Sequence, residues 1–167
     1  MQPLVNELAL HSDLWGEQAA RTGAETPHSE SQDIWLRYRD PDEYFAKYGS
    51  DMSAFCDEHE SIWLAPSEQL PWGRVLAEHI AAIVGQELGG VLLTRLPPGG
   101  RIEPHTDDGW HAAVHDKFFV PIKTALGARF CWEDGVIEGA AGDVWWFRND
   151  ISHWVENDSE EERIAMI

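Results

Sequence analysis

The chain has 167 residues, of which 30 are Asp or Glu and 12 are Lys or Arg, so its formal net charge is −18. This acidity argues against a nucleic-acid partner, because phosphate backbones are bound by basic surfaces. No basic segment precedes a long apolar run at the N-terminus, and no stretch approaches the roughly 18 apolar residues of a membrane-spanning helix. We therefore expect a cytoplasmic protein with no membrane partner and one domain over residues 1–167.

The N-terminal half, residues 1–90, is expected to support and cover a barrel rather than to form it. Its clearest element is a helix over residues 71–84, with a proline in the first turn and a glycine directly after the end. Alternating side chains predict a strand over 33–38, and shorter helices are expected near 5–10 and 41–48. The long helix carries an apolar stripe that we expect to pack on the barrel: Val75, Leu76, His79, Ile80, Ile83 and Val84.

After Gly90 the chain becomes a series of short strand-like segments separated by glycine or by charged residues. Many short strands with few helices favour a mainly β fold, in which residues 91–167 form the barrel and the N-terminal helices pack outside it. The expected strands cover residues 91–96, 101–107, 117–124, 128–133, 135–138, 144–147, 153–157 and 163–167.

The most informative motif is His105-Thr106-Asp107, which follows a strand-like run, a Pro-Gly turn and Pro104. About 1.4 pairs of the form His-x-Asp or His-x-Glu are expected by chance in a chain this acidic, and three occur, so the motif alone is weak. The other two, at His11 and His28, lie in polar sequence without a strand. Period-two geometry in an extended segment puts His105 and Asp107 on one face, where both can bind one metal ion.

A second histidine and an arginine follow in the expected distal strands. His153 begins one such strand and Arg163 the next, with a charged turn between them, so the two can lie on neighbouring strands of a hairpin. Two imidazoles and one carboxylate suit non-haem Fe(II), and an arginine fork suits a carboxylate co-substrate. Taken singly, His153 is equally consistent with a buried core histidine and Arg163 with a surface cation.

Three segments carry a family resemblance: residues 96–107 with their Pro-Pro-Gly-Gly turn and His105, His115 followed by 119–122, and residues 153–163. Together they resemble the aspartyl/asparaginyl β-hydroxylase family of Fe(II)- and 2-oxoglutarate-dependent dioxygenases. The resemblance implies a double-stranded β-helix, also called a jelly-roll or cupin-like barrel. It also departs in two places: Asp107 adds a carboxylate that the human-type enzyme lacks, and Ala113 stands where that enzyme has an arginine.

The resemblance implies a hydroxylase that oxidises an unactivated C–H of an amino acid, peptide or protein side chain and releases succinate and CO₂. His105, Asp107 and His153 would be the metal ligands and so the catalytic residues, with Fe(II), 2-oxoglutarate and O₂ as the cofactor and co-substrates. Arg163 would bind the distal carboxylate of 2-oxoglutarate, and His115 would lie near it. Lys123 and Thr124 are further candidates for that contact, depending on which face of their strand is inward.

Substrate contacts are expected from the N-terminal half and from the loop after the first metal ligands. The candidates are His28, Arg37, Arg39 and Trp110. The two arginines alternate on one strand and could bind a substrate carboxylate, although surface ion pairing in so acidic a chain accounts for them equally well. Trp110 could close over a substrate from a mobile loop, or could simply pack there.

Two other functions fit the same residues. A cupin-type metalloenzyme that does not use 2-oxoglutarate would share the barrel and the histidines, so dependence on Arg163 discriminates between them. A non-catalytic acidic binding protein would retain no metal and would show no thermal shift with Fe(II) and 2-oxoglutarate.

Overall fold

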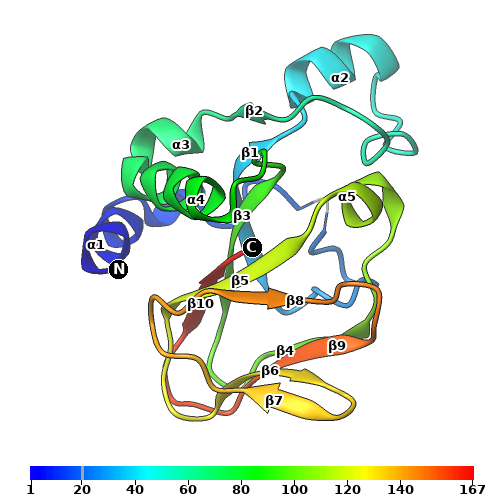
Figure 1. Cartoon of the computed structure of the whole chain (residues 1–167). Coiled ribbons are helices and arrows are strands. Elements are labelled where there is room, and N and C mark those ends of the chain that lie inside the picture. Colours follow the sequence, from blue (N-terminus) through cyan, green and yellow to red (C-terminus); the bar gives the residue numbers. More distant parts are fainter. Residues whose placement is uncertain (20) are drawn as a thin grey trace.

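Two antiparallel sheets face each other in the computed structural model, which describes residues 1–19 and 21–167 (Figure 1). The strand order is β2-β1-β3-β10-β5-β8 in the larger sheet and β4-β9-β6-β7 in the smaller one. This confirms the mainly β, double-stranded β-helix prediction. The strands are β1 Gln32–Tyr38, β2 Ile62–Trp63, β3 Val91–Leu96, β4 Arg101–His105, β5 Lys117–Lys123, β6 Ala128–Trp132, β7 Gly135–Ile137, β8 Trp145–Phe147, β9 His153–Asn157 and β10 Arg163–Met166.

Three of the helices lie on the outer face of the larger sheet, opposite the smaller sheet (Figure 1). Leu4, Leu8 and Leu70 from this layer join Leu36 and Leu93 of the sheet in one buried apolar cluster. No helix in the described part of the chain is both long enough and apolar enough to cross a membrane. The helices are α1 Gln2–Leu10, the 3₁₀ turn η1 Ser12–Leu14, α2 Pro41–Tyr48, α3 Pro66–Gln69, α4 Pro71–Val84 and α5 Gly109–Val114.

Helix α4 has the predicted bounds, and the expected apolar stripe packs on the barrel only in part: Leu76 and Ile80 lie against the buried cluster, whereas His79 and Val84 are exposed. Val75 and Ile83 are exposed, at 51% and 73%, whereas Gly73 and Ala77 are buried. A side chain at Gly73 would meet Leu36 Cδ1 at 2.8 Å, so the helix approaches the sheet most closely through its smallest residues. This close contact leaves no room for a larger side chain at Gly73, and Leu76 and Ile80 of the expected stripe remain only partly buried.

The smaller sheet packs on the inner face of the larger one through a second apolar cluster, which contains Phe119, Phe130 and Val155. Strands β9 and β10 lie in different sheets, so the prediction that His153 and Arg163 occupy neighbouring strands was wrong. The turn between them crosses from one sheet to the other. It is held by the buried amide of Asn157, which donates hydrogen bonds to the carbonyl oxygens of Leu96, Pro97 and Glu161.

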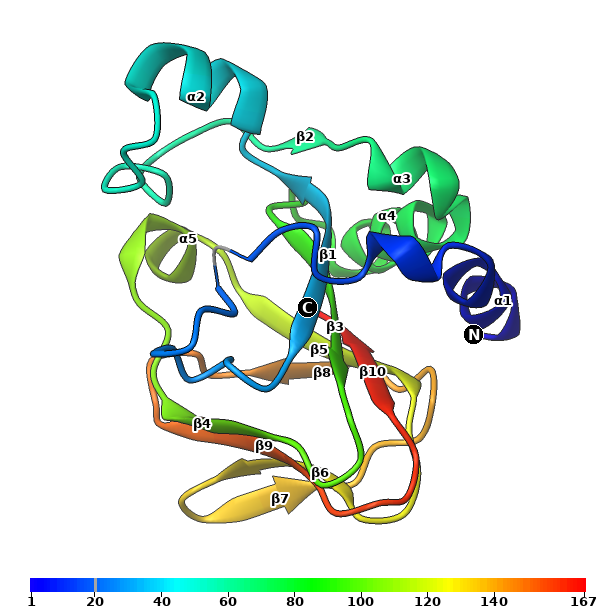
Figure 2. The ribbon, with the colours of Figure 1, turned by 180° about the vertical axis from the view of Figure 1, so that it is seen from behind.

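The segment that precedes β1 runs along the open edge of β4 (Figure 2). The backbone N–H of Glu103 donates to the carbonyl of Pro27, and that of Arg101 donates to the Glu30 carboxylate. Residues 27–30 therefore cover the strand that ends at His105.

Candidate metal centre

His105, Asp107 and His153 converge at one end of the barrel, and one ligand atom from each lies within 4.8 Å of the others. His105 ends β4 and His153 begins β9, and these two residues are paired across the smaller sheet. Asp107 follows in the loop that leads to α5. Within the described residues, this is the one group of three or more His, Cys, Asp or Glu side chains with this spacing.

Hydrogen bonds from the backbone orient both imidazoles. Nδ1 of His105 lies 2.7 Å from the carbonyl oxygen of Glu103, and Nδ1 of His153 lies 2.9 Å from that of Ile151. A carbonyl oxygen only accepts, so each Nδ1 carries the hydrogen and each Nε2 has a free lone pair for a metal. Burial lowers the pKa of His153, which favours the neutral form that binds metals.

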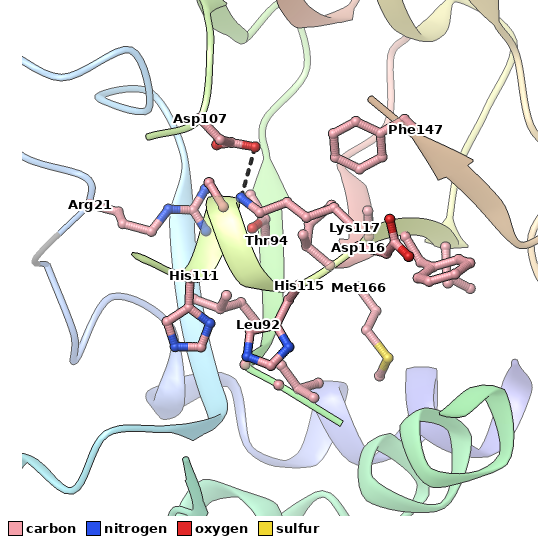
Figure 3. Close-up of a pocket in the computed structure, with 18 of the residues that line it drawn as sticks. Arg21, Leu92, Thr94, Asp107, His111, His115, Asp116, Lys117, Phe147 and Met166 are labelled. Carbon is pink, nitrogen blue, oxygen red and sulfur yellow. Dashed lines mark ion pairs between the residues drawn. The ribbon is translucent and has the colours of Figure 1, made fainter. Parts of the chain in front are cut away.

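Asp107 is held differently. Its Oδ2 lies 2.7 Å from Nζ of Lys117, the first residue of β5 (Figure 3). Its two oxygens lie 3.9 Å from His105 Nε2 and 3.7 Å from His153 Nε2. Two neutral imidazoles with one carboxylate form the donor set of non-haem iron sites that leave positions open for other ligands.

A cavity of about 810 Å³ adjoins the three residues, and Arg163 lines it from the facing sheet. The Arg163 side chain is 3% exposed, and its guanidinium lies 4.9 Å from the centre of the Phe119 ring. Burial lowers its pKa to about 10, so it remains charged at neutral pH. No carboxylate within residues 1–19 and 21–167 forms an ion pair with it. A buried cation without an acidic partner is costly unless a ligand supplies the negative charge.

Stacked aromatic rings connect the arginine to the distal histidine. Phe119, beneath the guanidinium, stacks on Phe130 at 5.1 Å, and Phe130 stacks on the His153 ring at 5.6 Å. These rings form an apolar wall with a cation at one end and an imidazole at the other. Such a wall suits an elongated ligand with a charged group at its far end.

Two predicted contact residues, His28 and His115, line this cavity, whereas Trp110 lies outside the lining and contacts His115. His28 packs edge-on against His105 at 4.7 Å and is hydrogen-bonded to Arg21, and burial, followed by the charge of Arg21, lowers its pKa to about 2. His115 lines the cavity but points away from Asp107 (Figure 3). Trp110 lies on α5 rather than in an irregular loop, where its ring contacts His115 at 5.5 Å.

The other four predicted residues lie outside the cavity lining. Arg37 donates to the Gly89 carbonyl, and Arg39 donates to the carbonyls of Ala54, Asp57 and Glu58, so both arginines brace the N-terminal segments. Lys123, at the opposite end of β5 from Lys117, pairs with Glu162 at 3.2 Å. Thr124 follows directly after β5.

Sequence reasoning overlooked two cavity residues, Lys117 and Arg21. Lys117 had a usable signal, because strand alternation places it on the same face as Phe119. Arg21 had none, since its position depends on a long-range ion pair, 3.6 Å from the buried carboxylate of Asp33.

Comparison with known proteins agrees with this geometry. A model of the aspartyl/asparaginyl beta-hydroxylase family matches residues 16–167. The chain belongs to that family. The predicted resemblance and the hydroxylase type of enzyme are thereby confirmed. No curated protein is similar to the chain at a significant level.

Two solved structures are similar to the chain to different degrees. An oxidoreductase of the 2OG-Fe(II) oxygenase family from Burkholderia pseudomallei is 16% identical, with a TM-score of 0.57, over 98% of this chain and 74% of that one. A cupin domain from Bordetella pertussis Tohama I is 23% identical, with a TM-score of 0.37, over 46% of this chain and 75% of that one. The fold assignment rests on the oxygenase and on the strand order, because a TM-score below 0.5 is too low to support it.

Proposed function

We propose that this family member is an Fe(II)- and 2-oxoglutarate-dependent dioxygenase. It hydroxylates an unactivated C–H of an amino acid, peptide or protein side chain. One atom of O₂ enters the hydroxyl group and the other enters succinate, which forms from 2-oxoglutarate with loss of CO₂. The observation that carries the proposal is Arg163, a buried cation without an acidic partner among the described residues, in the same cavity as the histidines and the carboxylate.

Arg163 supports 2-oxoglutarate because that co-substrate has a carboxylate at each end. A guanidinium grips a carboxylate through two parallel hydrogen bonds, and the bond is strong where water is excluded. With one carboxylate on Arg163, the chain of the co-substrate would extend along the Phe119 and Phe130 rings toward His153.

The metal-binding roles follow from the donor atoms. His105 and His153 would bind iron through Nε2, and Asp107 through one carboxylate oxygen. Iron, when bound, supplies the oxygen activation and the oxidising power. The chain's own share is to orient these ligands, to hold the co-substrate and to exclude water. His28 and Trp110 are the proposed substrate contacts, because they lie on the segments that border the site.

Anaerobic titration tests the proposal directly. Adding Fe(II) and then 2-oxoglutarate to the purified protein should produce a visible charge-transfer band, which neither component produces alone. Admitting O₂ should bleach the band and form one succinate per 2-oxoglutarate consumed. A panel of amino acids and peptides should then show which substrate accelerates succinate formation.

Two results would overturn the proposal in different ways. Iron binding without any 2-oxoglutarate-dependent band would indicate a cupin-type metalloenzyme that uses another reaction. Failure to bind iron, manganese, nickel or zinc would indicate a non-catalytic binding protein.

A further inference from the structure

The three proposed metal ligands differ in the protein groups that orient their side chains. Each histidine donates its Nδ1 hydrogen to a backbone carbonyl two residues away in the chain, Glu103 for His105 and Ile151 for His153. Asp107 instead relies on the side chain of Lys117, at 2.7 Å. Outer partners of this kind fix the orientation of metal ligands and tune their affinity.

Asp107 has particular need of such a partner because it lies outside regular structure. Strand β4 ends two residues before it, and α5 begins two residues after it. Its backbone N–H donates to the Asn149 carbonyl at 2.9 Å, which holds the main chain but leaves the side-chain torsions free. Within the described residues, Lys117 is the one lysine or arginine whose side chain contacts this carboxylate.

The backbone of Lys117 is held in place by strand pairing. This residue is the first of β5, paired with Phe147 of β8, and its side chain is 26% exposed. A partly buried lysine is stabilised by an anionic partner, because an ammonium loses hydration when it is removed from water. The pair thus joins the first residue of β5 to the loop that follows β4, and both residues line the cavity.

We propose that Lys117 is a positioning residue that holds the Asp107 carboxylate in the orientation needed for metal binding. The proposal rests on the proposed function, since it assigns Asp107 to the metal. The Lys117 ammonium would orient the Asp107 carboxylate, just as the Glu103 and Ile151 carbonyls orient the two imidazoles.

An ammonium beside a metal site also has an effect that lowers the metal affinity. Its positive charge repels a divalent cation, so a lysine that acted only through its charge would weaken metal binding. The positioning effect of the short contact should prevail here, because no other lysine or arginine side chain in the described part of the chain contacts this loop carboxylate. The sign of the change in metal affinity upon substitution therefore decides between the two roles.

The test is a Co²⁺ titration of the metal-free full chain under anaerobic conditions, followed by the visible absorption of bound Co²⁺. Lys117→Met removes the donor and the charge, whereas Lys117→Gln keeps an N–H donor without the charge. We expect Lys117→Met to bind Co²⁺ about 10 to 100 times more weakly than wild type, with a changed band shape. Lys117→Gln should recover part of that loss. Lys47→Met, a substitution of an exposed lysine on α2, should match wild type.

Equal or tighter Co²⁺ binding by Lys117→Met would overturn the proposal, and tighter binding would identify the ammonium as a competing charge. If Lys117→Met does not fold, Lys117→Gln decides alone, because it too should bind several-fold more weakly than wild type. In an Asp107→Ala background, Lys117→Met should cause no further loss, and an undiminished loss there would also overturn the proposal.

This experiment is separable from the test of the proposed function. Co²⁺ binding requires neither 2-oxoglutarate nor O₂. A protein that shows the Lys117 effect but no charge-transfer band with Fe(II) and 2-oxoglutarate would retain the inference and lose the proposed function. The reverse pair of results would retain the proposed function and lose the inference.

Discussion

Arg163, inside the barrel, and the arginines on its outer surface differ in whether the protein supplies an acidic partner. On the outside of the smaller sheet, Arg129 contacts both Glu156 and Asp158, and Arg101 shares the same two carboxylates at 3.0 and 3.1 Å. Inside the cavity, Arg163 has no acidic partner among the described residues. The surface arginines are thus paired within the protein itself, whereas the proposed function assigns a carboxylate of the co-substrate to Arg163.

The composition makes this contrast informative. With 30 acidic residues and 12 lysines and arginines, an acidic partner is easily found anywhere on the surface. A buried arginine that lacks one in such a chain is therefore not explained by scarcity of carboxylates. Asp107, the acidic residue of the candidate metal site, is already paired with Lys117.

Replacing a metal ligand should have the largest effect. His153→Ala removes the buried imidazole of the proposed metal site, so we expect loss of Fe(II) binding and at least about a thousand-fold lower succinate formation. His79→Ala is the matched control, because His79 is exposed on α4. Isothermal titration with Fe(II) and a succinate assay measure both variants. Retained iron affinity in His153→Ala would remove His153 from the metal site.

The interior arginine should have the next largest effect. Arg163→Met keeps an unbranched apolar side chain but removes the guanidinium and its charge, and loss of a buried charge partner typically costs about 2–5 kcal/mol. We expect the affinity for 2-oxoglutarate to fall at least about 30-fold while Fe(II) affinity stays close to wild type. Arg129→Met, the surface counterpart, should leave both affinities unchanged. Equal 2-oxoglutarate affinities in the two variants would mean that Arg163 contributes no more to co-substrate binding than the surface residue Arg129.

The sequence predicted the parts of the site that depend on local geometry. His105 and Asp107 converge because they are two residues apart in an extended segment, and α4 begins and ends at its proline and glycine signals. Helix α5 was missed because it has only six residues and depends on a distant contact, the Asn149 amide donating to the Ala112 carbonyl.

Features that depend on long-range pairing could not be predicted in this way. Period-two alternation identifies a strand but not the sheet that it joins, so His153 and Arg163 were expected side by side instead of across the barrel. For the same reason the sequence did not show that the side chains of Arg37 and Arg39 are engaged by backbone carbonyls. The composition indicated an acidic surface, but it did not show which arginine is buried.

Partly buried histidines should make the free energy of unfolding depend on pH. Nε2 of His111 lies 3.0 Å from Nε2 of His59, and burial, followed by the charges of His59 and His115, lowers the pKa of His111 to about 4. The unfolded chain, with a histidine pKa of about 6.5, binds this proton more readily, so stability is lost as the pH falls from about 6.5 to about 4. Between pH 7 and pH 5 we expect His111 to contribute a loss on the order of 1 kcal/mol, allowing for its partial exposure. Urea unfolding at the two pH values should show a smaller difference for His111→Gln than for wild type. An identical difference would show that His111 titrates normally.

Breaking the surface network should have the smallest effect, and salt should reveal why. Arg129→Met removes the contacts with Glu156 and Asp158, but Arg101 remains to neutralise both carboxylates. Exposed pairs of this kind contribute little and are screened by salt. We expect the thermal midpoint to fall by less than about 2 °C at low salt and to match wild type in about 0.5 M NaCl. A large, salt-insensitive fall would mean that Arg129 acts through packing, since the methylene groups of a removed arginine also cover apolar surface.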